Sequence, residues 1–590
     1  MQNKDGSICG HTFDPKEWET DLPEVESDLE DEWICHRDSH PEADVCVFHM
    51  STDTQDDLDI SNQQIVDRLL KEINKTGAES KEFIDATFDT VDLRDKIISP
   101  PDNCTLDLRH ASFEGKLLLE DATVTNDITF HGSEFQQVWM NGVKFEDEAN
   151  WYGCEFNGTV KADSATFGGK VLFARSQFQY GVRLRNSPTF EAKAIFSGAF
   201  FDSYLDVTGG YFESLAYFRD VNIYKANFNN TTFSESARFG DALFEEKAKF
   251  TEAVFQGQTY FGKKDRDEER DAATFECQAD FSGVTVNSIM EFVDTKFRRQ
   301  EEVVGQISSA DVLFNGLRCT GMLEFDPVES DEQILRVDFT DARICEGKLG
   351  QPIDGTALYD FQRAKVGDIE STSDTHNKSA LNAVRFVECD FDGFDFSRYR
   401  PALEPDYQIH TFSEIASVPE NNLSPVVKET TFQKAKTGAN NIGENRAASE
   451  FFIREMRARK SRLAEQLGQQ ETRRERIEHR LRYETNRFFG ATANYGESAS
   501  RVFGTSIAII LGYSGVYGVL YIVSGGEPYS SAPPVIEYFL LSLVSFTGLV
   551  HGGGATVDNW FIRLVTATEA FAGAFLIALF LFALTRSVYR

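Results

Sequence analysis

Phenylalanine recurs at an alternating step of five and six residues through the middle of this chain. The clearest run consists of Phe228, Phe233, Phe239, Phe244, Phe250, Phe255 and Phe261. This step matches neither the 3.6-residue repeat of a helix nor the 2-residue repeat of a strand. It predicts a chain that turns a corner every five or six residues and points one large apolar side chain inward on each face.

This stretch resembles the pentapeptide-repeat family. Small residues two positions before the phenylalanines, namely Ala226, Ala237 and Ala248, fit the repeat of that family. The resemblance implies a right-handed quadrilateral β-helix, predicted here over residues 81–397, whose coils stabilise one another by stacking. A charged insert at residues 263–273 is predicted to protrude from one face. The alternative is an ordinary β-domain rich in phenylalanine, in which seven consecutive phenylalanines (the rungs of the repeat) would have this spacing by chance.

Two segments near the C-terminus are each apolar and long enough to cross a membrane, which takes about 20 residues as a helix. Residues 502–526 carry no charge, and residues 564–585 carry only Glu569. Between them, residues 533–554 form a shorter apolar stretch that ends in a glycine run. Irregular backbone at membrane depth persists only where protein buries it or where it lines a water-filled path. The layout predicts a pore, and the alternative is a two-helix anchor with an ordinary external loop.

Residues 503–590 resemble the two-transmembrane pore module of potassium-channel-like proteins, and with its lead-in the all-α pore domain is predicted over 489–590. The resemblance implies a homotetramer that passes monovalent cations, with a gating hinge at Gly573. It also implies a selectivity filter formed by Thr547, Gly548, Leu549, Val550, His551 and Gly552. Val550 stands where the family has a glycine, and a β-branched residue resists the positive φ that the filter backbone requires. We therefore expect weak discrimination between potassium and sodium.

Charge gives the expected orientation in the membrane. Arginines crowd residues 473–501 and follow the second apolar segment, whereas residues 525–559 hold three acidic residues and no lysine or arginine. By the positive-inside tendency, both termini are cytoplasmic in a multi-pass protein of the cell membrane. The same arginines are expected to contact membrane lipids.

A coupling region is predicted over residues 398–488, between the β-helix and the pore domain. Residues 398–440 have the composition of a linker. Residues 445–486 are helical by propensity and are divided near Gly468 into a hairpin. This region is either a gating lever or a plain surface helix.

The net charge of −36, from 95 acidic and 59 basic residues, indicates a salt-adapted protein that repels nucleic acid. The chain holds no G-x-S-x-G motif, phosphate-binding lysine loop or G-x-G-x-x-G motif, so no enzymatic activity is expected. An acidic β-helix could also be a soluble mimic of DNA, but the apolar segments argue against that role. The odd number of nine cysteines fits a reducing cytoplasm.

Residues 1–55 hold a candidate structural zinc site, composed of Cys9, Cys35, Cys46 and His49. The C-x2-H spacing suits tetrahedral zinc, and a metal would order an acidic segment too short to build a core. Nearby histidines could exchange into the set: His11, His36 and His40. The alternative is free cysteines in a loose tail. Residues 56–80 follow, and a helix over 62–75 is predicted to cap the β-helix.

Two functions remain open on the sequence alone. The first is a weakly selective cation channel whose cytoplasmic β-helix acts as a regulator or scaffold. The second is a non-conducting, membrane-anchored scaffold whose β-helix binds a protein partner.

Overall fold

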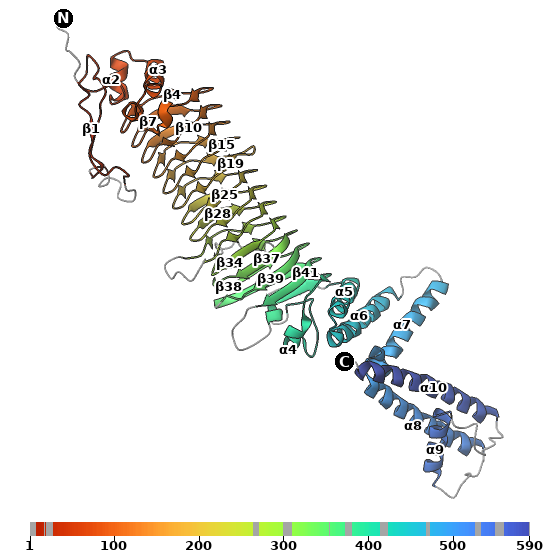
Figure 1. Ribbon diagram of the computed structural model, residues 1–590. Coiled ribbons are helices and arrows are strands. Elements are labelled where there is room, and N and C mark those ends of the chain that lie inside the picture. The colour runs from red at the N-terminus through yellow and green to blue at the C-terminus, as the bar shows by residue number, and fades with distance from the viewer. Residues whose placement is uncertain are drawn as a thin grey trace. The chain divides into compact units, whose positions relative to one another are not determined.

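A computed structural model describes residues 8–16, 18, 27–263, 271–298, 310–352, 354–371, 380–412, 423–467, 473–524, 533–548 and 560–588. The chain divides into two compact units. The first comprises residues 1–386 and 412–415, and the second comprises residues 387–411 and 416–590. A parallel β-solenoid spans residues 87–391, and the region after it is all-α (Figure 1).

The solenoid makes about 12 turns with a period of 22 residues. One turn contains four two-residue strands, so the coil has four faces: β13 (Glu155–Phe156), β14 (Val160–Lys161), β15 (Thr166–Phe167) and β16 (Val171–Leu172). Each strand pairs in parallel with its counterpart in the next turn, as Phe156 does with Phe178. The predicted β-solenoid is therefore confirmed.

Phenylalanine rings stack in columns along the inside of the solenoid. Phe239 lies between Phe218 and Phe261, with ring centroids 5.1 and 4.6 Å away and planes nearly parallel. All seven rungs of the predicted run are at most 1% exposed. The small residues two positions earlier are buried as well, as at Ala237. The 5/6 ladder is thus the core of the solenoid.

Left-handed corners explain why acidic and amide residues follow many of the rungs. Asn230, Asp241 and Glu252 each lie two residues after a rung and have φ angles of 55°, 58° and 58°. Asparagine and aspartate enter this region at lower cost than other side chains, and glycine enters it most easily. The corners therefore place part of the acidic charge at fixed positions on the outer surface.

The charged insert interrupts the solenoid as predicted. In β28 (Leu243–Lys249) and β31 (Thr274–Phe275), Phe244 pairs with Phe275, 31 residues later instead of 22. Nine extra residues therefore leave the column here, and residues 264–270 lie outside the described part of the chain.

The N-terminal segment contains the hairpin β1 (Thr12–Phe13) and β2 (Trp33–Ile34), followed by α2 (Thr52–Asp57) and α3 (Asn62–Ile73). A capping box between Ser61 and Gln64 begins α3. The predicted helix is confirmed within two residues. Its apolar stripe, Ile65, Val66, Leu69 and Ile73, is buried.

The prediction of a linker over residues 398–440 is wrong from Pro425 onward. Helix α5 (Pro425–Asn441) begins there because the Ser424 hydroxyl accepts a hydrogen bond from the Val427 amide and proline suits a first turn. Phe432 of α5 is buried and lies 6.5 Å from the ring of Phe451. The linker composition therefore concealed a helix start.

The other helices follow the predicted order. Helices α6 (Asn445–Gln466) and α7 (Arg473–Ala493) lie on either side of Gly468, itself outside the described residues, and they pack on each other. Beyond them lie α8 (Ala499–Ser524), the short α9 (Pro534–Phe546) and α10 (Trp560–Val588).

Candidate metal centre and membrane helices

Four side chains of the N-terminal segment meet in one cluster: Cys9, Cys35, Cys46 and His49. Their ligand atoms all lie within 4.8 Å of one another. His49 Nδ1 is 3.2 Å from the Cys46 sulfur and 3.6 Å from the Cys9 sulfur, and the Cys35 and Cys46 sulfurs are 3.9 Å apart. Tetrahedral zinc, bonded at about 2.0–2.3 Å, separates its ligand atoms by roughly 3.5–3.8 Å. The cluster could therefore hold a metal such as zinc.

Antiparallel pairing closes the long gap between Cys9 and Cys35. The β1–β2 hairpin places Thr12 opposite Ile34, and outside it the Cys9 amide donates to the Arg37 carbonyl at 2.7 Å. A tight turn supplies the other two ligands, because the His49 amide donates to the Cys46 carbonyl at 3.0 Å. The fold thus brings together all four predicted ligands.

Groups around His49 orient its ring. The His49 Nε2–H donates to the Ile84 carbonyl at 2.9 Å, which leaves the Nδ1 lone pair directed at the sulfurs. His11 stacks on this ring at 4.2 Å and lies 2.8 Å from a carboxylate oxygen of Asp85. His11 therefore supports the cluster from outside. The four residues that the structure brings together include neither His36 nor His40.

The surroundings shift the pKa values of the three thiols in different directions. Hydrogen bonds to Cys46 and then to His49 lower the pKa of Cys35, in spite of its burial. The hydrogen bond to Cys35, followed by burial, raises the pKa of Cys46, and burial raises the pKa of Cys9. A divalent cation would favour three thiolates at once, so the donor set suits zinc.

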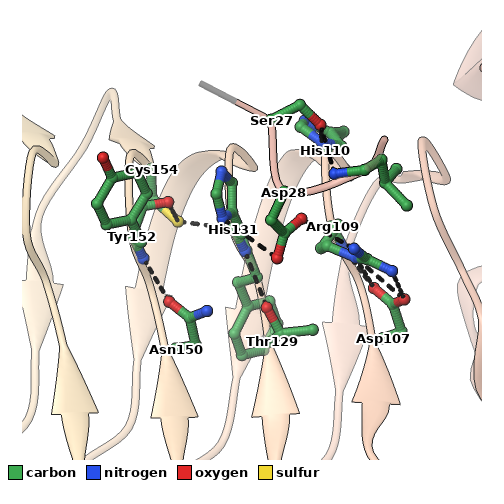
Figure 2. A network of polar contacts seen from close by, with 12 residues as sticks. Ser27, Asp28, Asp107, Arg109, His110, Thr129, His131, Asn150, Tyr152 and Cys154 are labelled. Atoms are coloured by element: carbon green, nitrogen blue, oxygen red, sulfur yellow. Dashed lines mark hydrogen bonds and ion pairs between the residues drawn. The ribbon is translucent and has the colours of Figure 1, made fainter. Parts of the chain in front are cut away.

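Further polar contacts fasten the N-terminal segment to the first coils (Figure 2). The Arg109 guanidinium donates to Asp28 at 2.8 Å, and His131 Nδ1 lies 3.6 Å from the other oxygen of Asp28. The Ser27 hydroxyl lies 3.0 Å from Nε2 of His110. The segment is therefore held to the solenoid by ion pairs and hydrogen bonds as well as by the cluster.

His110 is part of this fastening and is buried. Phe13 stacks on its ring at 4.5 Å and Trp18 meets it edge-on at 4.3 Å. Burial, followed by the neighbouring His131, lowers the pKa of His110 to about 3. Its Nδ1 has no hydrogen-bond partner among the described residues, whereas a serine–histidine catalytic pair needs a carboxylate there. The pair with Ser27 therefore has the contacts of a structural fastener.

Helices α8 and α10 are long and apolar enough to cross a membrane. In their most apolar stretches only 17% and 22% of the residues are buried within the protein. Ile522 on α8 and Phe571 on α10 are each 79% exposed. Exposed apolar surface of this extent needs lipid or another protein chain to cover it.

Helix α9 packs closely on α10 at Gly573. A Cβ atom at this position would lie 1.9 Å from the carbonyl oxygen of Phe546, the last residue of α9, so only glycine fits. Helix α10 runs unbroken through Gly573. The glycine predicted as a hinge thus has a packing role, and its role in gating stays a prediction.

Glu569 joins all three apolar helices. Its side chain, on α10, is fully buried. The Tyr517 hydroxyl of α8 donates to Glu569 Oε2 at 2.5 Å, and the Ser542 hydroxyl of α9 bonds to the other carboxylate oxygen. Burying a carboxylate this completely without such partners would cost a large amount of free energy. The sequence showed Glu569 as the lone charge of its segment, but nothing in the spacing identified its partners.

The filter prediction falls largely outside the described residues. Thr547 and Gly548 follow α9, and Gly548 has a φ angle of 71°. Leu549, Val550, His551 and Gly552 are not described. At the other end of α10, Arg586 pairs with Glu497 at 2.9 Å, so the end of α10 lies beside the start of α8.

Comparisons of the chain with protein-family models, with curated proteins and with solved structures found no match.

Proposed function

We propose that this protein is a membrane cation channel of the two-transmembrane, potassium-channel-like type, with weak discrimination between potassium and sodium. The observation that carries the proposal is the short apolar helix α9 held against two longer apolar helices at Gly573 and Glu569. A membrane anchor needs no such third helix. In a homotetramer, four copies of residues 547–552 would surround the axis and form the ion path.

The charge distribution supports a cytoplasmic solenoid. The Arg586–Glu497 pair brings the end of α10 beside the start of α8, which follows the arginine-rich α7, and the positive-inside tendency assigns these ends to the cytoplasm. The solenoid precedes α8 and would lie on that side, as a regulatory or scaffold domain. Its phenylalanine columns and left-handed corners favour the pentapeptide-repeat family.

Ion flux into liposomes that contain the full-length protein tests this function. We expect sodium and potassium flux from the unaltered protein and at least a tenfold loss with Gly573→Ala, because the added Cβ displaces α9. The matched control is Gly512→Ala on α8, where a Cβ would meet no atom of the described residues within 4 Å. Unchanged flux in Gly573→Ala would mean that the position of α9 does not affect the ion path.

The second candidate function is a non-conducting, membrane-anchored scaffold. The departure of Val550 from the family glycine favours it, since a filter that cannot form would not conduct. Absence of flux from protein shown to be inserted in the liposomes would support the scaffold over the channel.

We also propose that Cys9, Cys35, Cys46 and His49 hold one structural zinc ion. The ion would lock the N-terminal segment over the first coil, where Arg37 already donates to the carbonyl of Ser80 at 3.0 Å and lies 4.2 Å from the ring of Phe83. Elemental analysis of protein purified without added metal tests for this ion.

A further inference from the structure

A basic pocket of about 510 Å³ lies between α6, α7 and the start of α8. Four cationic side chains line it: Arg457, Lys460, Arg487 and Arg501. Neutral polar groups accompany them, including Ser461, Tyr483 and Asn494, and no acidic residue stands among the described lining residues. In a chain with a net charge of −36, this concentration of uncompensated positive charge requires an explanation.

Three of these cations have no carboxylate partner within the described part of the chain. They are Arg457, Lys460 and Arg501, whereas Arg487 makes only an exposed pair with Glu484 at 3.5 Å. Burial, followed by the charges of Arg454 and Arg501, lowers the pKa of Arg457. Positive charges that line the same pocket repel one another, and an anionic ligand between them would relieve that repulsion.

Elsewhere on α6 the arginines are paired. Arg459 bonds to Glu429 at 2.8 Å and to Glu455 at 3.1 Å, and Arg462 bonds to Glu429 at 2.6 Å. The helix thus matches its charges where they face α5 and leaves them unmatched where they face the pocket. The uncompensated charge is therefore specific to one face of the helix.

The wall of the pocket is built by an unusual turn. Asn494, Tyr495 and Gly496, which link α7 to α8, have consecutive positive φ angles of 47°, 63° and 88°. The Tyr495 hydroxyl donates to Asn486 at 3.1 Å, and its ring lies over Gly490, where a Cβ would meet the hydroxyl oxygen at 2.7 Å. These contacts fix Tyr495 and the neighbouring Asn494 at the edge of the pocket.

We propose that this pocket binds the phosphate headgroup of an anionic membrane phospholipid. Guanidinium and ammonium groups are the side chains that bind phosphate oxygens most strongly. Arg501 is the third residue of α8, so the pocket opens where that helix would enter the membrane, at headgroup level. The inference rests on the proposed insertion of α8. Free phosphate shares the chemistry of the headgroup, and the experiment separates the two sources.

The test uses full-length protein in neutral detergent at 1 M KCl, where long-range electrostatic attraction is screened to about 3 Å. Binding of a fluorescent phosphatidylglycerol is followed by anisotropy, with short-chain phosphatidylglycerol, short-chain phosphatidylcholine and inorganic phosphate as competitors. The pocket variant combines Arg457→Gln, Lys460→Gln and Arg487→Gln. The control combines Arg474→Gln, Arg476→Gln and Arg480→Gln on α7, which remove the same charge outside the pocket lining.

We expect phosphatidylglycerol to compete at least tenfold better than phosphatidylcholine. The pocket variant should lose at least tenfold in affinity and the control less than threefold, with circular dichroism unchanged in both. Equal losses in the two variants would overturn the site, and displacement by millimolar inorganic phosphate would make it a site for the free anion.

Extraction of membranes with alkaline carbonate separates failure of this inference from failure of the membrane function. Protein released by carbonate would contradict insertion of α8. Protein that stays in the membrane but does not discriminate between the two lipids would overturn the pocket alone.

Discussion

In the solenoid, one apolar side chain in every five or six residues stacks on a counterpart one turn away, whereas helices α8, α9 and α10 are joined by contacts that each occur once. Phe239 and Phe261 have equivalent environments in successive turns, since their rings stack in one column. Gly573 and Glu569 have no such equivalents. The stability of the solenoid therefore depends on many similar contacts. The packing of α8, α9 and α10, called the helical module below, depends on a few contacts.

This difference predicts where single substitutions act most strongly. A change in one rung of the solenoid removes contacts to two neighbouring turns, because each turn is stabilised by those on either side. A change at a polar contact between α8, α9 and α10 removes one hydrogen bond.

The largest effect is expected from a charge placed in a phenylalanine column. Phe239→Asp or Phe250→Asp should destabilise the solenoid by about 4 kcal/mol, because an unpaired carboxylate replaces a ring stacked on both sides. Urea unfolding by circular dichroism and limited proteolysis measure the change. Phe200→Asp is the control, since Phe200 is 39% exposed. An unchanged protease pattern in Phe239→Asp would mean that the rung does not face inward.

The metal cluster should show the next largest effect. We expect about one zinc per chain, lost in Cys46→Ser or His49→Ala, because a site with three remaining ligands binds much more weakly. The N-terminal segment should then be cleaved while the solenoid stays resistant. Cys104→Ser should keep the zinc, since Cys104 lies outside the cluster. Unaltered protein without zinc would leave the cysteines as free thiols.

A smaller effect is expected at the buried carboxylate of the helical module. Tyr517→Phe and Ser542→Ala should each cost about 0.6–1.7 kcal/mol, the range for hydrogen bonds between helices in membranes. In double-mutant cycles with Glu569→Gln, measured by unfolding in detergent, each should show coupling. Tyr513→Phe should cost less, because within the described part of the chain its hydroxyl makes a single long contact, 3.4 Å from Thr568. Additive effects would mean that Glu569 does not join the helices.

The last effect concerns acid and is spread over several pH units. His110 has a pKa of about 3 when folded, against about 6.5 when unfolded, so the unfolded chain binds more protons between these values. Stability should therefore fall as the pH drops below 6.5, by at most about 1.4 kcal/mol per pH unit. His110→Asn, which suits the φ of 58° at this position, should flatten the slope of the urea midpoint between pH 7 and pH 5. An unchanged slope would contradict the lowered pKa of His110 in the folded protein.

Repetition explains how much of this fold could be predicted from the sequence. The seven phenylalanines from Phe228 to Phe261 occupy the same kind of buried position, one on each successive face. This repeated spacing predicted the solenoid even though the sequence does not show which strands pair. The helix at Pro425 was missed because its start consists of serine and proline, which also compose linkers. The C-x2-H spacing pointed to a possible metal site, whereas the approach of Cys9 and Cys35 to it depends on the β1–β2 pairing.

Singular contacts could not be predicted in the same way. The clash that excludes a side chain at Gly573 depends on the position of Phe546, 27 residues earlier. The partners of Glu569 lie on two other helices, and hydroxyl residues such as Tyr517 and Ser542 are common in apolar segments. Their roles become visible only when the helices are packed together.

The reversal potential of the reconstituted protein, with potassium on one side of a bilayer and sodium on the other, tests the proposed channel most directly. A backbone relaxed around Val550 should let both ions retain part of their water and pass at similar rates. We therefore predict a clear current that reverses close to 0 mV and is lost in Gly573→Ala but not in Gly512→Ala. Reversal displaced by about 59 mV or more, which corresponds to a tenfold preference for potassium, would contradict weak selectivity. Absence of current from inserted protein would contradict the channel itself.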